Sequence, residues 1–156
     1  LSYKHEAVLG VILAPVSGEI YFAVKNEGSY YQKDRSSKPI KIHVNDKTEN
    51  LTTLVSRFHS NETEQAMIKK HSDKIKHQAI IGATLKGCVI ARGLAEMSYR
   101  FSSNTKEWDT CAMQIIVEEA GGYLLKFDGE PIRYNREDVY NHDGYLICNR
   151  KENFLL

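Results

Sequence analysis

The 156-residue sequence lacks several features that would assign it to a class of protein. Its cysteines, Cys88, Cys111 and Cys148, lie far apart without a CxxC pair, which argues against zinc or dithiol redox sites and favours reduced thiols. The net charge is only +1, so no overall charge draws the chain to nucleic acid or an anionic membrane. There is no run of about 18 apolar residues, and no transmembrane helix is expected. The first residues also lack the apolar core of a secretion signal, so a cytoplasmic protein is expected.

Short strands dominate the first 50 residues. Residues 8–14 form a nearly continuous apolar run, which predicts a strand covered on both faces. Further strands are expected at 20–24 and from 29 onwards, each after a turn. Apolar and polar residues alternate weakly at 40–44, which favours another strand. Residues 1–50 are therefore expected to form antiparallel strands.

Strands and helices alternate in residues 51–156, which predicts a layered mixed α/β (α+β) domain. Asn61 followed by Glu64 fits a capping box that starts the first helix. The expected helices are 61–74, 85–97 and 107–120. The expected strands are 51–58, 79–83, 99–101, 123–127 and 144–148.

The pair Trp108-Asp109 begins the clearest helix of the sequence. An aspartate in a first helical turn can simply cap the helix, which is the more common role in an arbitrary protein. A carboxylate is also a suitable ligand for magnesium, which shares its coordination shell with phosphate oxygens and water. In the second interpretation, Trp108 packs beneath Asp109 and fixes its position.

The segment Gly82–Gly87 follows an expected strand and begins an expected helix. Free backbone N–H groups, the Thr84 hydroxyl and the Lys86 ammonium make it a candidate phosphate cradle. It is not a Walker A loop, because Cys88-Val89 stands where that motif needs Lys followed by Ser or Thr. Similar segments are common outside phosphate sites, so both interpretations remain open.

Three further candidates lie at the ends of expected strands, where α/β folds place their ligands. Arg57 or His59 can contact a phosphate or stack on a base, and Arg100 follows Tyr99 in the strand expected at 99–101. An ordinary solvated surface side chain is an equally good interpretation of each.

The motifs together resemble one family. EWDTCAMQIIVEEAGG, at 107–122, resembles the C-terminal signature of the inositol monophosphatase superfamily. GATLKGCVIARGLAEMSYRF, at 82–101, is similar to the preceding segment in the 3′(2′),5′-bisphosphate nucleotidase (CysQ-like) branch. SRFH at 56–59, YNRED at 134–138 and the strand pair at 8–24 fit that branch as well. The resemblance covers essentially the whole chain.

The resemblance implies an α-β-α-β-α sandwich with mixed sheets and a magnesium-dependent phosphomonoesterase acting on a small phosphorylated molecule. Asp109 matches a carboxylate that helps to hold Mg²⁺ and orients the substrate. Lys86 matches a residue that contacts the non-scissile phosphate of a nucleotide. His59 and Arg100 match positions near the nucleotide, and Arg57 is a weaker match. Neither a nucleic-acid polymer nor a membrane is expected as a partner, and homo-oligomer formation is left open.

The sequence departs from the family in two places. The branch usually has Ser at the position of Ala83, next to Gly82, although Thr84 keeps a neighbouring hydroxyl. The Asp-Pro-x-Asp-Gly-Thr motif that supplies other metal ligands is absent. We therefore expect residues 1–156 to be the C-terminal portion of a longer phosphatase domain, with 1–50 completing its upstream part, and the isolated chain to be inactive. An inositol or sugar phosphate phosphatase and a non-catalytic phosphate-binding fragment are the alternatives.

Overall fold

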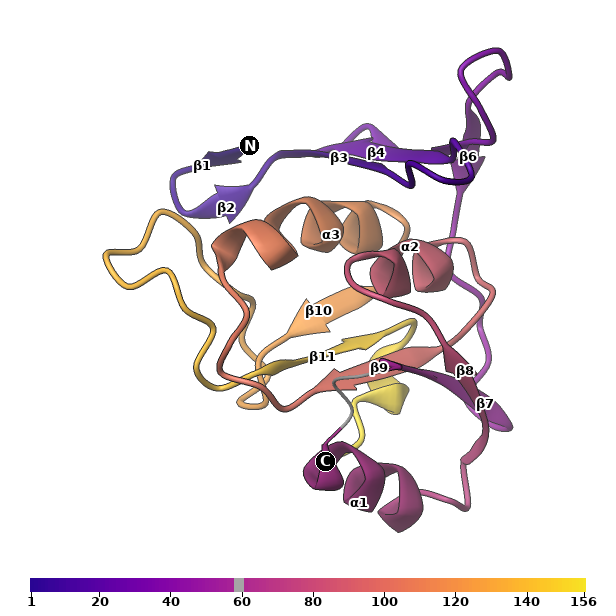
Figure 1. The fold of residues 1–156 in the computed structure, drawn as a ribbon, viewed down its shortest axis with the longest axis vertical. Coiled ribbons are helices and arrows are strands. Elements are labelled where there is room, and N and C mark those ends of the chain that lie inside the picture. Colours follow the sequence, from indigo (N-terminus) through magenta and orange to yellow (C-terminus); the bar gives the residue numbers. More distant parts are fainter. Residues whose placement is uncertain (58–60) are drawn as a thin grey trace.

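The computed structural model describes residues 1–57 and 61–156, and it has a layered architecture (Figure 1). A four-stranded sheet lies on one side of helices α2 and α3, and a five-stranded sheet lies on the other side. A third helix, α1, packs on the far face of the second sheet, where its Ile68 joins Leu51 and Met97 in an apolar cluster. The expected layered α/β fold with mixed sheets is confirmed.

The first sheet is an antiparallel meander, as the sequence predicts. Its strand order is β3-β4-β5-β6, and a separate two-stranded ribbon, β1-β2, precedes it. The bounds are β1 (Ser2–Tyr3), β2 (Glu6–Ala7), β3 (Leu9–Leu13), β4 (Ile20–Val24), β5 (Gly28–Gln32) and β6 (Ile40–Ile42).

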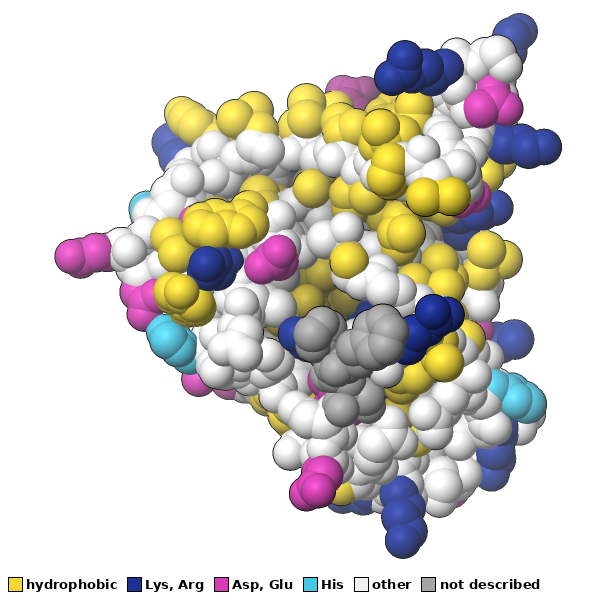
Figure 2. All heavy atoms as spheres, in the orientation of Figure 1, with side chains coloured by type: hydrophobic (Ala, Val, Ile, Leu, Met, Phe, Trp, Pro, Cys, Tyr) yellow, Lys and Arg dark blue, Asp and Glu magenta, His cyan; other side chains and the backbone are white. Residues whose placement is uncertain are grey.

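The outer face of this sheet is apolar and exposed. Leu9, Val11 and Leu13 in β3 are 37%, 58% and 48% exposed, and Val24, which lies opposite Leu9, is exposed as well. Figure 2 shows hydrophobic side chains gathered along the edge where β3 and β4 lie in Figure 1. The prediction that the strand at 8–14 is covered on both faces is wrong for the described chain, because alternate residues point away from the helical layer.

The second sheet is mixed and has the strand order β10-β11-β9-β7-β8. Strand β7 runs parallel to β8 and β9, whereas β11 is antiparallel to both β9 and β10. The bounds are β7 (Leu51–Val55), β8 (Ile75–Ile80), β9 (Met97–Arg100), β10 (Tyr123–Leu125) and β11 (Tyr145–Cys148). The expected buried strand at 79–83 is wrong, because β8 lies earlier in the chain and forms a mostly exposed sheet edge.

Helix α1 (Glu62–Lys70) begins as predicted and ends four residues earlier than expected. The Asn61 side chain accepts a hydrogen bond of 2.8 Å from the backbone N of Glu64, which satisfies one of the free donors of the first turn. The buried Glu64 carboxylate accepts a hydrogen bond of 3.3 Å from the backbone N of Phe101. Asn61 Nδ2 donates to the carbonyl of Phe101 at 2.6 Å, so the start of α1 is held against the end of β9.

Helix α2 (Leu85–Ala91) is shorter than the helix expected at 85–97. It ends because Gly93 adopts a left-handed backbone conformation with φ of +72°, which stops the helical hydrogen-bond ladder. The chain then enters β9 at Met97. The pattern of apolar residues did not reveal the end of α2, because apolar residues continue from the helix into β9.

Helix α3 (Glu107–Glu119) agrees with the prediction to within one residue. It contacts β3, β4 and β5 on one side and β10 on the other. The chain closes with a short 3-10 helix, η1 (Lys151–Asn153). None of the described helices is long and apolar enough to cross a membrane.

Gly10 allows β3 to lie directly on α3, and this contact yields a stability prediction. A Cβ at Gly10 would stand 2.6 Å from the backbone O of Ala112 and 2.7 Å from its Cα, so the strand or the helix must move. We expect Gly10→Ala to lower the free energy of unfolding by about 1–3 kcal/mol, as overpacking does. Urea unfolding measures the change. Gly82→Ala, with open space around the new Cβ, is the control, and equal effects of the two substitutions would contradict the prediction.

Candidate functional site

A cavity of about 450 Å³ lies where the starts of α2 and α3 face the second sheet. Six of the residues singled out in the sequence line it, although they come from three separate segments of the chain. These are Gly82, Ala83, Thr84, Lys86, Arg100 and Asp109.

The floor of the cavity is formed by two neighbouring antiparallel strands. Arg100 of β9 lies opposite Tyr145 of β11, and Ser98 lies opposite Ile147. Because alternate residues of a strand point to the same face, these four side chains share one face of the sheet. All four line the cavity.

Asp109 caps its helix and lines the cavity at the same time. One of its carboxylate oxygens, Oδ2, accepts a hydrogen bond of 2.8 Å from the backbone N of Lys106, the residue that caps α3. The two interpretations of this aspartate are therefore compatible, because the contact fixes the carboxylate at the mouth of the helix.

Trp108 does not pack beneath Asp109, and that expectation is wrong. Its side chain is 65% exposed, and the Lys106 ammonium lies 5.2 Å from its ring centroid. The residue precedes Asp109 on the helix, and neighbouring helical residues point about 100° apart, so the ring faces outward while the carboxylate faces the cavity.

Lys86 is a buried cation, with only 6% of its surface exposed. Its Nζ donates a hydrogen bond of 2.7 Å to Ser56 Oγ, an uncharged partner that does not neutralise the ammonium. Burial lowers the pKa of Lys86, the Glu64 carboxylate opposes this shift, and the Arg100 cation adds to it. The site thus holds a positive charge in a poorly solvated position, which is suited to an anionic ligand.

The loop before α2 adopts an uncommon backbone conformation. Ala83 has φ of +51°, in the left-handed region that disfavours residues with a Cβ. Thr84 is the N-cap residue, and its hydroxyl makes no capping hydrogen bond. The hydroxyl therefore stays available to the cavity that Thr84 lines.

Of the remaining two candidates, one falls on residues that the structure does not describe and the other does not line the cavity. His59 lies outside the described residues. Arg57 is described, and it is absent from the described residues that line the cavity.

Sequence reasoning missed several residues of the site. Ser56 was part of the SRFH motif but carried no assigned role, and it proves to be the partner of Lys86. Tyr145 gave no local signal, because its place opposite Arg100 depends on strand pairing. Glu64 was assigned only to helix capping, although its charge acts on Lys86.

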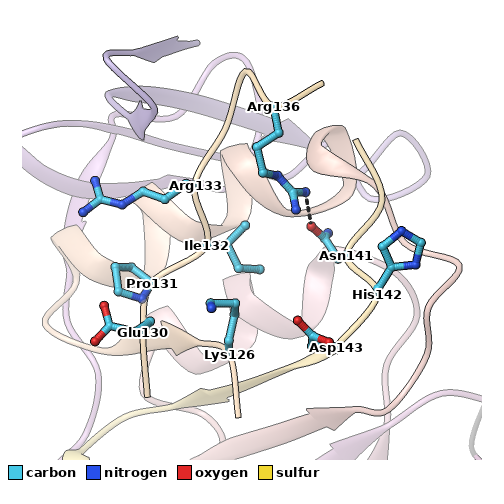
Figure 3. Close-up of a pocket in the computed structure, with 10 residues that line it drawn as sticks. Lys126, Glu130, Pro131, Ile132, Arg133, Arg136, Asn141, His142 and Asp143 are labelled. Carbon is cyan, nitrogen blue, oxygen red and sulfur yellow. Dashed lines mark hydrogen bonds between the residues drawn. The ribbon is translucent and has the colours of Figure 1, made fainter. Parts of the chain in front are cut away.

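A second cavity, of about 390 Å³, is lined by residues between Lys126 and Gly144 (Figure 3). Its cations already have partners: Lys126 Nζ lies 2.6 Å from Asp128 Oδ2, and Arg136 Nε lies 3.1 Å from Glu107 Oε1. Arg136 also donates to Asn141, as Figure 3 shows. Because these charges are paired, this cavity is less suited to an anion than the cavity around Lys86.

The described residues offer only part of a metal site. Asp109 is the one carboxylate among the described residues lining the cavity around Lys86. No group of three or more His, Cys, Asp or Glu residues that could hold a metal ion occurs within residues 1–57 and 61–156. One carboxylate together with phosphate oxygens and water suits Mg²⁺, which often binds proteins through one or two carboxylates.

The model of the Inositol monophosphatase family matches residues 1–155. The chain belongs to the inositol monophosphatase family. The resemblance that the Trp108-Asp109 helix and the Gly82 segment indicated is thereby confirmed.

Curated relatives of this family member carry the name 3′(2′),5′-bisphosphate nucleotidase CysQ. The Escherichia coli (strain K12) protein is 30% identical over 142 residues, covering 90% of this chain and 54% of the relative. The Buchnera aphidicola protein is 35% identical over 130 residues, covering 82% of this chain and 46% of the relative. The chain thus spans about half the length of the curated relatives it matches.

Solved structures of the family have the same fold. The crystal structure of CysQ from Bacteroides thetaiotaomicron matches with a TM-score of 0.79 and 29% identity, covering 94% of this chain and 60% of that chain. An inositol monophosphatase from Zymomonas mobilis matches with a TM-score of 0.75 at 18% identity, covering 96% and 55% of the two chains. The second match supports the fold alone.

The buried charge of Lys86 leads to a prediction about stability. We expect Lys86→Met to leave the free energy of unfolding unchanged or to raise it by about 1 kcal/mol near neutral pH, because a buried cation is replaced by an apolar side chain. The pKa of Lys86 is lower in the folded protein than in the unfolded chain. At a pH between these two pKa values, the unfolded chain therefore binds more protons than the folded protein. Wild-type stability therefore rises as pH increases through the lowered pKa, and the advantage of the variant shrinks.

Urea unfolding of both proteins at about pH 7 and about pH 10 measures this difference. Lys33→Met, at an exposed lysine, is the control. An advantage of the Lys86 variant that grows towards alkaline pH would contradict the prediction.

Proposed function

We propose that the protein is a magnesium-dependent phosphomonoesterase that removes the 3′(2′)-phosphate from adenosine 3′,5′-bisphosphate-type nucleotides. The observation that carries this proposal is the convergence of Lys86, Arg100 and Asp109 on one cavity. The names of the CysQ relatives support the choice of substrate.

The charges of the cavity suit a doubly phosphorylated ligand. Lys86 and Arg100 are cations that can bind phosphate oxygens, and guanidinium groups do so with two parallel hydrogen bonds. The Thr84 hydroxyl can add a neutral donor at the start of α2. We assign Lys86 and Arg100 to substrate binding, with Lys86 at the non-scissile phosphate.

The size of the cavity favours a small molecule over a polymer. A volume of about 450 Å³ falls in the range of pockets that enclose a single small ligand. The net charge of these 156 residues, +1, also gives no overall attraction to nucleic acid.

Asp109 is the residue of this chain that would hold Mg²⁺, together with phosphate oxygens and water. When bound, the metal would supply Lewis-acid polarisation of the phosphate. The hydrogen bond from Lys106 N to Oδ2 keeps the Asp109 carboxylate oriented without consuming its second oxygen. We propose that the remaining metal ligands come from parts of the protein outside these 156 residues.

The test is release of inorganic phosphate from adenosine 3′,5′-bisphosphate by the full-length protein, with Mg²⁺ and with a chelator. We expect Asp109→Asn to lower kcat/KM by about 100-fold or more, the scale seen when a group that stabilises the transition state is removed. Asparagine keeps an oxygen that can accept from Lys106 N, so the fold should be retained.

Asp128→Asn is the matched control, since Asp128 lies in a turn and pairs with Lys126. A magnesium-dependent rate that survives Asp109→Asn would show the assignment of Asp109 to be wrong. Faster turnover of inositol monophosphate than of the nucleotide would favour the alternative substrate class. Phosphate binding by the full-length protein without turnover would favour a non-catalytic role.

A further inference from the structure

Tyr145 is a buried residue of the cavity to which neither the sequence motifs nor the proposed function assigns a role. Only 7% of its surface is exposed, and it lines the cavity that contains Lys86 and Asp109. It lies opposite Arg100 across the β9–β11 pair, so its side chain emerges from the sheet beside that cation.

Within residues 1–57 and 61–156 the Tyr145 hydroxyl makes no hydrogen bond, and it is not among the buried polar atoms left without a partner, so it is open to the cavity. Other buried tyrosines differ: Tyr134 donates to Gln114 Oε1, and Tyr99 donates to the carbonyl of Leu155. A group that lines a cavity can find its partner in the molecule that fills the cavity.

The surroundings of Tyr145 keep its hydroxyl protonated. Burial raises the pKa of Tyr145 to about 12, a net value in which the Arg100 cation opposes the shift and the Asp109 and Glu64 carboxylates add to it. The group is therefore a neutral donor across the physiological range, and a neutral donor beside a cation is suited to an anionic oxygen.

We propose that the Tyr145 hydroxyl donates a hydrogen bond to a phosphate oxygen of the bound substrate. This inference rests on the proposed function, because it requires a phosphorylated ligand in the cavity. It assigns Tyr145 to substrate recognition beside Lys86 and Arg100.

The loop at the start of α2 and strand β11 bring hydroxyl groups to the cavity from two different sides. Ala83 lines the cavity without a hydroxyl, and Thr84 beside it contributes one. Tyr145 reaches the same cavity from the opposite, sheet side. It therefore adds a donor from β11 to the Thr84 hydroxyl that the loop provides.

The experiment compares Tyr145→Phe with the wild type in the full-length protein, using adenosine 3′,5′-bisphosphate as substrate. We expect the KM to rise about tenfold, the typical effect of losing a hydrogen bond to a charged group. The ratio of the two KM values should stay constant between about pH 6 and pH 9, since the hydroxyl remains protonated throughout. The midpoint of thermal unfolding should not fall, because the hydroxyl has no partner in the described protein.

Tyr134→Phe is the matched control, since it removes a buried hydroxyl that is bonded inside the core. It should lower the unfolding midpoint and leave the KM unchanged. A KM of Tyr145→Phe within about twofold of wild type would overturn the inference. The inference would also be overturned if the KM of Tyr145→Phe rose together with a fall in the unfolding midpoint as large as that of Tyr134→Phe.

The outcome also separates this inference from the proposed function. If the wild-type protein neither hydrolyses nor binds the nucleotide, both proposals fail. If the wild type hydrolyses it and Tyr145→Phe behaves identically, only the assignment of Tyr145 fails.

Discussion

Helix α3 is packed on both sides, and the positions of the other elements follow from that constraint. Six of its thirteen residues are buried, because one sheet approaches it through Gly10 and the other lies against its opposite side. A helix held in this way has little freedom to shift, since protein interiors are densely packed. Its first turn therefore presents Asp109 at a fixed place relative to Lys86 on α2 and Arg100 on β9.

The sequence predicts those parts of the fold whose signals are local. Helix α3 and the Asn61 cap were found because each carries its own pattern of apolar or capping residues. The end of α2 was missed because the apolar pattern continues past Gly93 into β9. The exposure of Val11 was missed because a continuous apolar run does not show whether a second layer covers it.

The candidate site follows the same division. Motif resemblance identified Asp109, Lys86, Arg100 and the Gly82 segment, which the fold brings to one cavity. It could not identify Tyr145, whose role depends on strand register, and it misjudged the direction of the Trp108 ring. Burial lowers the pKa of Lys86, so we expect its ammonium to oppose the stability of the fold while it suits an anionic ligand.

The outward Trp108 ring has a practical consequence. It is the single tryptophan of the sequence, it directly precedes Asp109, and a lysine ammonium lies over its face. Indole fluorescence responds to the polarity and charge of its immediate surroundings. A metal ion or a phosphate arriving at Asp109 would change that local field, so Trp108 would act as an intrinsic optical reporter next to the site. The difference in emission between the unlabelled protein and its Trp108→Phe variant would follow arrival of a ligand at Asp109 separately from turnover.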